Sequence, residues 1–371
     1  MHPSHRGAAA DRAPRAAPVA QAVVVTGVSR YLAATVAARL AADPRVGRVV
    51  GLDAAAPPAD VAPQLDGVTT VVAEPHRAAD VLADLRADVV VHMAVTSRPP
   101  RADDADDDAK ERNVIGTMQL LAACQRAPLL RKLIVRSSTA AYGASFKDPA
   151  VFTEETAPRA TPRGGFARDI LDIEGYLRGF ARRRPDVLAT VLRFAPIIGS
   201  AADTTLTRYF ASPFVPTVLG RDPRLQFVHL DDVREILHEA VVGAHPGTFN
   251  VAGAGVLTLS QAIRRAGRIP VPVPEQGLSA AAALARGLDL GGYGFDQLDL
   301  FVHGRVVDTA RLVAEFGVTP RTTAEAFDDF IRAHRGGTVL PATQVAAVEQ
   351  ALLDGIRRIR AARPEAADVA G

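Results

Sequence analysis

The chain has 371 residues, 48% of them hydrophobic and 23% charged, and its formal net charge is +2. This composition is typical of a globular protein that buries a sizeable core, in one large domain or two unequal lobes. No basic stripe interleaved with aromatic residues is present, which argues against a nucleic-acid partner. No stretch approaches the ~18 uninterrupted apolar residues of a membrane span. We therefore expect a cytoplasmic protein with no membrane partner.

Three local features carry little chemistry. Residues 1–20 are rich in arginine, alanine and proline and lack the apolar run of a signal peptide, so we predict a disordered tail. Cys124 has no second cysteine to pair with and lies in the apolar run LLAACQ, which indicates a buried structural thiol. The acids of ADDADDDAK (102–110) are not at metal-ligand spacing, so we expect a solvated loop ahead of a helix and no metal site.

Six short apolar runs alternate with helical segments in the first half of the chain. They cover residues 22–27, 48–53, 68–74, 87–95, 132–138 and 188–194. Strands that are apolar on both faces and separated by helices indicate a parallel sheet covered on both sides. We predict an α/β fold with a Rossmann-type doubly wound parallel sheet over residues 21–196. Its ligand should lie along the edge formed by the strands' carboxyl ends.

The pattern loosens after residue 196 into segments punctuated by proline and glycine. We predict a smaller substrate-binding lobe over 197–337, from which part of the chain returns to the first domain. A C-terminal helix and tail should follow at 338–371. Residues 342–362 (ATQVAAVEQALLDGIRRIRAA) form an amphipathic helix with basic residues near its end, which favour the helix dipole. Packing on its own domain is its expected role, ahead of membrane or partner binding.

The first strand and the helix after it meet at a glycine. Gly27 ends the run AVVVTG, where backbone N–H groups and a helix dipole can meet a pyrophosphate. Asp53 ends the next strand 26 residues later, close to the ~20-residue offset at which an acid accepts from a ribose 2′-OH. Together they indicate a dinucleotide site.

Several motifs in order resemble the extended short-chain dehydrogenase/reductase superfamily, in particular its nucleotide-sugar epimerase/dehydratase type. They are VVHMAV (90–95), NVIGTMQLLAA (113–123), SSTAAYG (137–143), LRFAPIIG (192–199), FVHLDDV (227–233), TFNVAG (248–253) and VDTARL (307–312). The resemblance runs from about residue 22 to 335. It implies a dinucleotide cofactor and a small-molecule substrate, often a nucleotide sugar, in the C-terminal lobe. It also implies a homodimer formed through two long helices, one of them 166–183.

The resemblance assigns a cofactor site in which two of the family's three loop glycines are replaced. Gly27 is kept, whereas Arg30 and Ala33 occupy the other two places. The Arg30 guanidinium either pairs with phosphate charge or faces solvent, and we favour retained binding. Asp53 would repel a 2′-phosphate, so NAD is expected ahead of NADP. By resemblance the site also includes Tyr31, Leu32, Glu74, Met93, Ala94 and Asn113, although Glu74 also fits a plain surface acid.

The catalytic positions implied by the resemblance are only partly filled. Ser138 matches the family's serine, although it also fits a hydroxyl that satisfies a strand end. The Glu174–Leu177 segment fixes the alignment of a Tyr-x-x-x-Lys helix, which places Phe166 at the tyrosine position and Ile170 at the lysine position. The chain's lysines, at 110, 132 and 147, all precede this helix. Arg168 lies about 200° around the helix from Phe166 and should point elsewhere.

The same helix has a continuous apolar face. Its apolar residues recur at intervals of four and three, which is the period of one helical face. They are Phe166, Ile170, Ile173, Leu177 and Phe180. We interpret the segment as an active-site wall rebuilt as core.

Around the expected substrate the resemblance assigns Ser97, Tyr142 and Pro196. Pro196 stands where the family often has asparagine, and Leu225-Gln226 replace an Arg-Asp pair common in sugar-nucleotide enzymes. His92 and His229 occupy strand-end motifs and are expected to be structural.

Three hypotheses remain open. The first is a cofactor-binding but catalytically silent family member that acts as a sensor, scaffold or regulator. The second is an active epimerase, dehydratase or reductase with a non-standard base. The third, ranked last, is a structural domain that no longer binds a dinucleotide.

Overall fold

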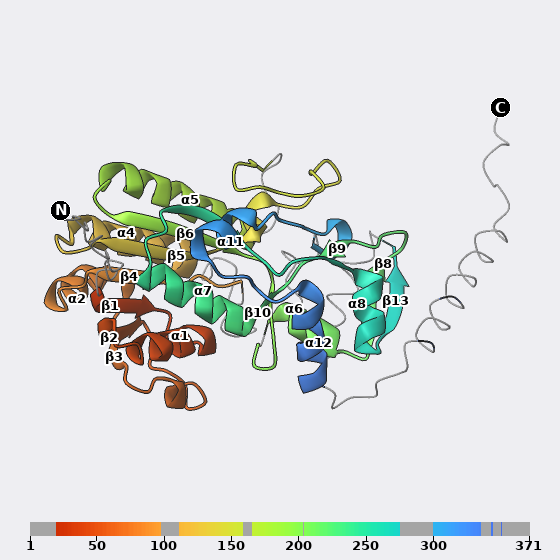
Figure 1. Ribbon diagram of the computed structural model, residues 1–371, viewed down its shortest axis with the longest axis horizontal. Coiled ribbons are helices and arrows are strands. Elements are labelled where there is room, and N and C mark those ends of the chain that lie inside the picture. Colours follow the sequence, from red (N-terminus) through yellow and green to blue (C-terminus); the bar gives the residue numbers. More distant parts are fainter. Residues whose placement is uncertain are drawn as a thin grey trace, which may run out of the picture.

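A computed structural model of the chain describes residues 20–97, 111–158, 165–202, 204–274 and 300–334, together with residues 343 and 350 (Figure 1). The predicted tail, the acidic run 102–110 and nearly all of the predicted helix 342–362 lie outside these residues. Among the described helices, none combines the length and apolar character needed to cross a bilayer.

The centre of the molecule is a seven-stranded sheet in the order β11-β6-β5-β4-β1-β2-β3, and every neighbouring pair is parallel. Because the strand order reverses beside β1, the switch point lies between β1 and β4, where a ligand cleft is expected. The strands are β1 (Ala20–Thr26), β2 (Val46–Asp53), β3 (Thr69–Val72), β4 (Val89–His92), β5 (Lys132–Ser138), β6 (Leu188–Phe194) and β11 (Gly247–Val251).

Helices cover both faces of this sheet (Figure 1). One face packs against α1 (Tyr31–Ala41), α7 (Leu230–Val242) and α11 (Ala310–Phe316), and we call the core between them the α1/α7 core. The opposite face packs against α2 (Ala78–Asp84), α4 (Gly116–Arg126) and α5 (Gly165–Arg183), which form the α4/α5 core. The doubly wound parallel sheet predicted from the sequence is therefore confirmed.

Short single turns connect these elements. They are η1 (Ala62–Gln64), η2 (Pro75–Arg77) and η4 (Thr139–Tyr142), which are 3₁₀ turns, and η3 (Glu111–Ile115), a π-helical turn that leads into α4. π-turns of this kind are rare and recur at functional sites.

The segments after residue 196 build a third hydrophobic cluster beside the sheet. Its aromatic centre includes Phe210 and Phe327, whose rings meet edge to face at 4.9 Å between centroids. Three helices here begin with capping boxes, which satisfy their first N–H groups. The elements are β7 (Ile197–Ile198), α6 (Thr205–Ala211), β8 (Phe214–Val218), β9 (Arg224–Leu225), β10 (Val228–His229), β12 (Leu257–Thr258), α8 (Leu259–Ala266), β13 (Ile269–Val273) and α12 (Thr323–Ala333).

All six predicted strands correspond to strands of the sheet. The seventh strand, β11, comes from the TFNVAG landmark, and together with α7 it returns to the sheet from beyond residue 196. The domain boundaries 21–196 and 197–337 stay predictions. Residues from both ranges contribute side chains to the α1/α7 core.

Candidate functional site

The turn after β1 leaves no room for a side chain at Gly27. Its φ is +81°, and a Cβ built there would lie 2.9 Å from the Cα and N of Ala94. The turn is closed by the Gly27 N–H, which donates to Leu52 O at 3.0 Å, and by the Arg30 N–H, which donates to Gly27 O at 3.1 Å. Only glycine combines this φ with so close an approach of two strand ends. The turn at Gly27 therefore requires glycine, and the assignment of this residue to the cofactor stays a prediction.

Asp53 fixes the same turn from the neighbouring strand. It is the last residue of β2, and its Oδ2 accepts a hydrogen bond from the Ser29 N–H at 2.8 Å. The carboxylate is partly exposed at the carboxyl edge of the sheet, beside the N-terminus of α1. The assignment of Asp53 to a ribose hydroxyl stays a prediction.

Arg30 replaces the second loop glycine and lies across the switch point. Its Nη1 donates to the carbonyl oxygen of Ala94 at 2.7 Å. Burial lowers the pKa of this guanidinium, against which the nearby Asp53 charge acts. The fully solvent-facing side chain considered from the sequence is therefore wrong, because Arg30 folds back over the loop after β4.

Tyr31 and Leu32 form the first turn of α1 and are partly buried against the α1/α7 core. The Arg234 guanidinium lies over the Tyr31 ring, 5.6 Å from its centroid, and donates to the phenol oxygen at 3.3 Å. The first turn of α1 is thus held by α7, a helix that comes 200 residues later in the chain.

The end of β4 is organised by buried side chains. Thr26 Oγ1 accepts hydrogen bonds from the N–H groups of Met93 (3.1 Å) and Ala94 (3.3 Å) and pairs with His92 Nδ1 at 2.8 Å. His92 Nε2 lies 2.8 Å from Thr117 Oγ1, so the imidazole bridges β1 and α4. Burial lowers the pKa of His92 to about 4, which keeps the ring neutral. Its contacts agree with the structural role expected of it.

Asn113, in the π-turn η3, clamps the loop that follows β4. Its Oδ1 accepts from the Thr96 N–H at 3.1 Å, and its Nδ2 donates to Thr96 O at 2.9 Å and to Asp169 Oδ2 at 3.0 Å. Asp169 is a buried carboxylate on α5 that is not predicted as a site residue from the sequence. Ser97 lies exposed at the end of this loop.

Glu74 is not the end of a strand. β3 stops at Val72, and Glu74 is the exposed N-cap residue of η2. The strand ends early because the chain turns at Pro75, which has no N–H for a sheet. The predicted placement of Glu74 on the strand is therefore wrong by two residues, while its assignment to adenine stays a prediction.

At the catalytic end, Ser138 closes β5. Its Oγ accepts from the Ala140 N–H at 3.1 Å and caps the turn η4, which is the strand-end contact considered from the sequence. Ile170 is 1% exposed in the α4/α5 core, and Phe166 is partly buried against the same core. Arg168 is exposed, as the helix geometry predicts. The continuous apolar face of α5 is confirmed.

Tyr142 is buried in a polar network that joins distant segments. Its hydroxyl lies 2.7 Å from Asn250 Oδ1 and 2.9 Å from Thr153 O, and it accepts from Arg193 Nη1 at 2.8 Å. Burial raises the pKa of this phenol, and the Arg193 charge opposes the increase. The hydroxyl is occupied by the protein itself, which suits a structural role.

Arg193 also forms a buried ion pair with Glu174 of α5. Its Nη2 lies 2.6 Å from Glu174 Oε2 and its Nε 2.9 Å from Oε1, while Ser137 Oγ donates to Oε1 at 2.6 Å. From the sequence, Glu174 serves only to align the helix, and Arg193 is not predicted as a site residue. The sequence feature that could have identified Arg193 as a site residue is its place as a lone arginine inside the apolar run LATVLRF.

Arg136 was missed for a similar reason, as a charge inside the run KLIVRSS. Its Nη1 donates to Val95 O at 2.8 Å, but its Nε is buried and has no hydrogen-bond partner. Orphaned buried donors are rare in folded proteins.

Pro196, which the resemblance assigns to the substrate, follows β6. Its carbonyl oxygen accepts a hydrogen bond from the Val228 N–H at 3.1 Å.

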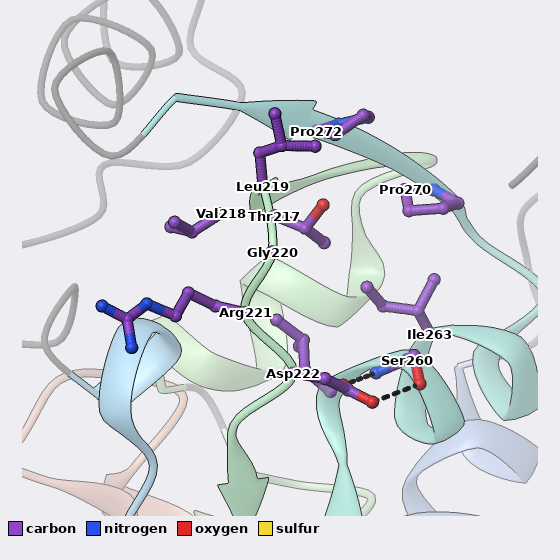
Figure 2. Close-up of a pocket in the computed structure, with 11 residues that line it drawn as sticks. Thr217, Val218, Leu219, Gly220, Arg221, Asp222, Ser260, Ile263, Pro270 and Pro272 are labelled. Atoms are coloured by element: carbon purple, nitrogen blue, oxygen red, sulfur yellow. Dashed lines mark hydrogen bonds between the residues drawn. The ribbon is translucent and has the colours of Figure 1, made fainter. Parts of the chain in front are cut away.

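Two cavities lie away from the switch point. One of about 240 Å³ is bounded by residues 217–222, by Pro270 and Pro272, and by α8, at the opposite end of the long axis from β1–β3 (Figures 1 and 2). Figure 2 shows Asp222 bonded to Ser260 at its rim, at 2.8 Å to both N–H and Oγ. A second cavity, of about 480 Å³, lies between the loop after β5 and the third cluster. Its lining includes Phe146, Arg221, Arg224, His303 and Arg305.

Within the described part of the chain, no group of three or more His, Cys, Asp or Glu side chains is placed to hold a metal ion. Cys124 is buried, and burial raises the pKa of its thiol to about 12. The thiol therefore stays protonated at neutral pH and is a poor nucleophile.

The fold defines a doubly wound α/β protein whose β1/β4 switch point lies at the carboxyl edge of a parallel sheet. A model of the NAD dependent epimerase/dehydratase family matches residues 23–252, and the chain belongs to that family. An uncharacterized protein of Mycobacterium tuberculosis strain H37Rv is 45% identical over 313 residues, covering 84% of this chain and 83% of the relative.

Solved structures share the fold at low sequence identity. UDP-glucose 4-epimerase of Thermotoga maritima, solved with UDP-glucose, aligns with a TM-score of 0.65 and 18% identity over 85% of this chain and 99% of its own. dTDP-glucose 4,6-dehydratase of Bacillus anthracis, solved with NAD, aligns with a TM-score of 0.65 and 14% identity over 86% and 98%.

Proposed function

We propose that this chain binds NAD at the β1/β4 switch point and does not carry out the family's phenolate-based hydride chemistry. Family membership, the tight turn at Gly27 and the NAD bound in the dehydratase of B. anthracis support cofactor binding. The acid Asp53 favours NAD over NADP, since it would repel a 2′-phosphate. Such a protein would act as a sensor, scaffold or regulator whose state depends on whether the dinucleotide is bound.

The observation that carries the silent site is the burial of Ile170. A catalytic phenol needs a nearby cation to lower its pKa from ~10 toward neutrality. At the aligned lysine position the chain instead places an aliphatic side chain that is 1% exposed. Phe166, at the aligned tyrosine position, has no ionisable oxygen. The Tyr142 hydroxyl accepts a hydrogen bond from Arg193. Neither a base nor the cation that would activate it stands at these positions.

The test measures binding and turnover separately. The purified full chain is melted with NAD⁺, NADH, NADP⁺ and NADPH, and a ligand at 100 times its Kd should stabilise the fold by about 2.7 kcal/mol. We expect the largest shift with NAD⁺ or NADH, and no change in 340 nm absorbance or in sugar composition with a panel of UDP- and dTDP-sugars. Turnover by the unmodified chain contradicts the silent site, and a melt unmoved by any dinucleotide contradicts cofactor binding.

A paired variant asks whether only the catalytic pair is missing. Phe166→Tyr with Ile170→Lys installs the family's phenol and amine, and Phe166→Tyr alone is its matched control. Gain of turnover by the pair and not by the control supports a site that is otherwise intact. The lysine enters a buried position, so folding is checked by circular dichroism before activity is read.

A second candidate is an active enzyme with a non-standard base, and Asp169 is the observation in its favour. This carboxylate precedes Ile170 on α5, is buried, and accepts from Asn113 at the end of the cofactor edge. Any turnover found in the unmodified chain should then be lost in Asp169→Asn, a change that keeps the size of the side chain. The nucleotide sugars bound by the structural relatives make this class the first to be screened.

A further inference from the structure

Arg136 is a partly buried cation on the central strand β5. By strand alternation it shares the face of Ile134, which the α1/α7 core covers. Its Nη1 is satisfied by Val95 O, whereas its Nε is buried without a partner, and no carboxylate of the described chain pairs with it. Burial lowers the pKa of this guanidinium only to about 10, so it remains charged at neutral pH. A buried charge without a counterion is costly unless a ligand neutralises it.

Arg30 brings a second cation to the same place. It donates to Ala94 O and Arg136 donates to Val95 O, so the two guanidinium groups bond consecutive carbonyls of the loop after β4. The Arg30 charge lowers the pKa of Arg136, and the charge of a third arginine, Arg112, lowers the pKa of Arg30. The acid that acts on Arg30 is Asp53, and one of its oxygens already accepts the Ser29 N–H. Positive charge is therefore in excess at the switch point.

We propose that Arg30 and Arg136 together bind phosphate oxygens at the β1/β4 switch point, and that the phosphates are the pyrophosphate of the dinucleotide. In this chain two arginine side chains would donate the hydrogen bonds to phosphate that backbone N–H groups donate in a loop of three glycines. Guanidinium groups suit this task, since each presents paired N–H donors to phosphate oxygens. The inference rests on the proposed function. A smaller phosphorylated compound offers the same chemistry, and the test separates the two sources.

Calorimetric titration of the full chain with NAD⁺, ADP, inorganic pyrophosphate and adenosine provides the test. The variants are Arg30→Gln, Arg136→Met and Arg136→Lys, and Arg178→Gln, an exposed position on α5, is the charge-matched control. We expect NAD⁺ and ADP affinity to fall at least tenfold in Arg30→Gln and Arg136→Met and less in Arg136→Lys. Arg178→Gln should bind as the unmodified chain does, and adenosine affinity should not depend on either arginine.

The second readout is the melting temperature, measured without ligand and with NAD⁺. Arg136→Met removes a partly buried charge that has no carboxylate partner in the described chain and fills similar volume, so its melting temperature without ligand should not fall, while its NAD⁺-induced shift should shrink. If Arg136→Met does not fold, Arg136→Lys, which keeps the charge but loses the paired N–H donors, should still show a smaller NAD⁺-induced shift than the unmodified chain.

The outcomes separate the inference from the function on which it rests. NAD⁺ binding that is unchanged or tighter in both Arg30→Gln and Arg136→Met overturns the two-arginine site and leaves cofactor binding standing. Arginine-dependent binding of inorganic pyrophosphate without any binding of NAD⁺ overturns the dinucleotide source and the proposed function, and retains the phosphate site. Binding of none of the four probes overturns both.

Discussion

At the scale of single residues, the most informative position is Ile170. It lies on the apolar face of α5 and is buried in the α4/α5 core. A position that the family resemblance assigns to a charged group has become part of the hydrophobic core. The helix is therefore kept in place by packing, which does not depend on any ligand.

Ile170→Ala should destabilise the fold by roughly 2–5 kcal/mol, because it removes buried methyl groups and leaves a cavity. Urea unfolding followed by circular dichroism measures the change. Arg168→Ala, two residues away on the exposed side of the same helix, should stay within about 0.5 kcal/mol of the unmodified chain. Equal effects at the two positions would show that Ile170 is not core.

At the scale of elements, two buried polar groups join segments that are distant in sequence. The Arg193–Glu174 pair connects β6 to α5 and also holds Tyr142 of η4. His92 connects β1 to α4 through two threonine hydroxyls. Each fixes the end of a strand near the candidate site.

Arg193→Met should cost roughly 3–5 kcal/mol, because Glu174 would be left buried without its cation. Adding Glu174→Gln removes the orphaned charge and should recover part of that loss, a coupling that a double-mutant cycle in urea measures. Arg126→Met, at an exposed end of α4, is the control. Simple additivity of the two changes would contradict a direct pair.

His92 should make stability depend on pH in a defined window. Its folded pKa, about 4, lies below the ordinary value of 6.5, so the unfolded chain binds a proton first as the pH falls. The free energy of unfolding is therefore unaffected by His92 above about pH 6.5. It falls as the pH drops from 6.5 to about 4, by up to about 3 kcal/mol in total. His92→Gln should flatten the fall in unfolding free energy between pH 7 and 5. The exposed His76→Gln should not, and a steep fall retained in His92→Gln would assign it to other groups.

At the scale of the whole molecule, the first half of the chain does not complete its own sheet. β11 pairs with β6 at the sheet edge, and α7 supplies much of the α1/α7 core, yet both follow residue 196. Figure 1 shows α7 lying along the sheet beside α1. The nucleotide-binding unit therefore depends on chain that is interleaved with the C-terminal lobe.

A chain truncated after residue 196 should fail to unfold cooperatively, because it exposes one face of the sheet and the edge of β6. Urea titration with circular dichroism and dye binding compares it with the full chain. A single sharp transition in the truncated chain would show that residues 21–196 fold as an independent domain.

The sequence by itself determined the architecture, since continuous β-branched runs and alternating helices leave few ways to bury their apolar faces. It also determined that Phe166 and Ile170 carry neither an ionisable oxygen nor an amine, because residue identity needs no coordinates. The tertiary structure alone decided which polar side chains meet: Glu174 lies against Arg193 and Asn113 against Asp169, while the buried Nε of Arg136 has no hydrogen-bond partner in the part of the chain that the structure describes. Such partners come from different strands and helices, and a one-residue change of register would turn them to opposite faces.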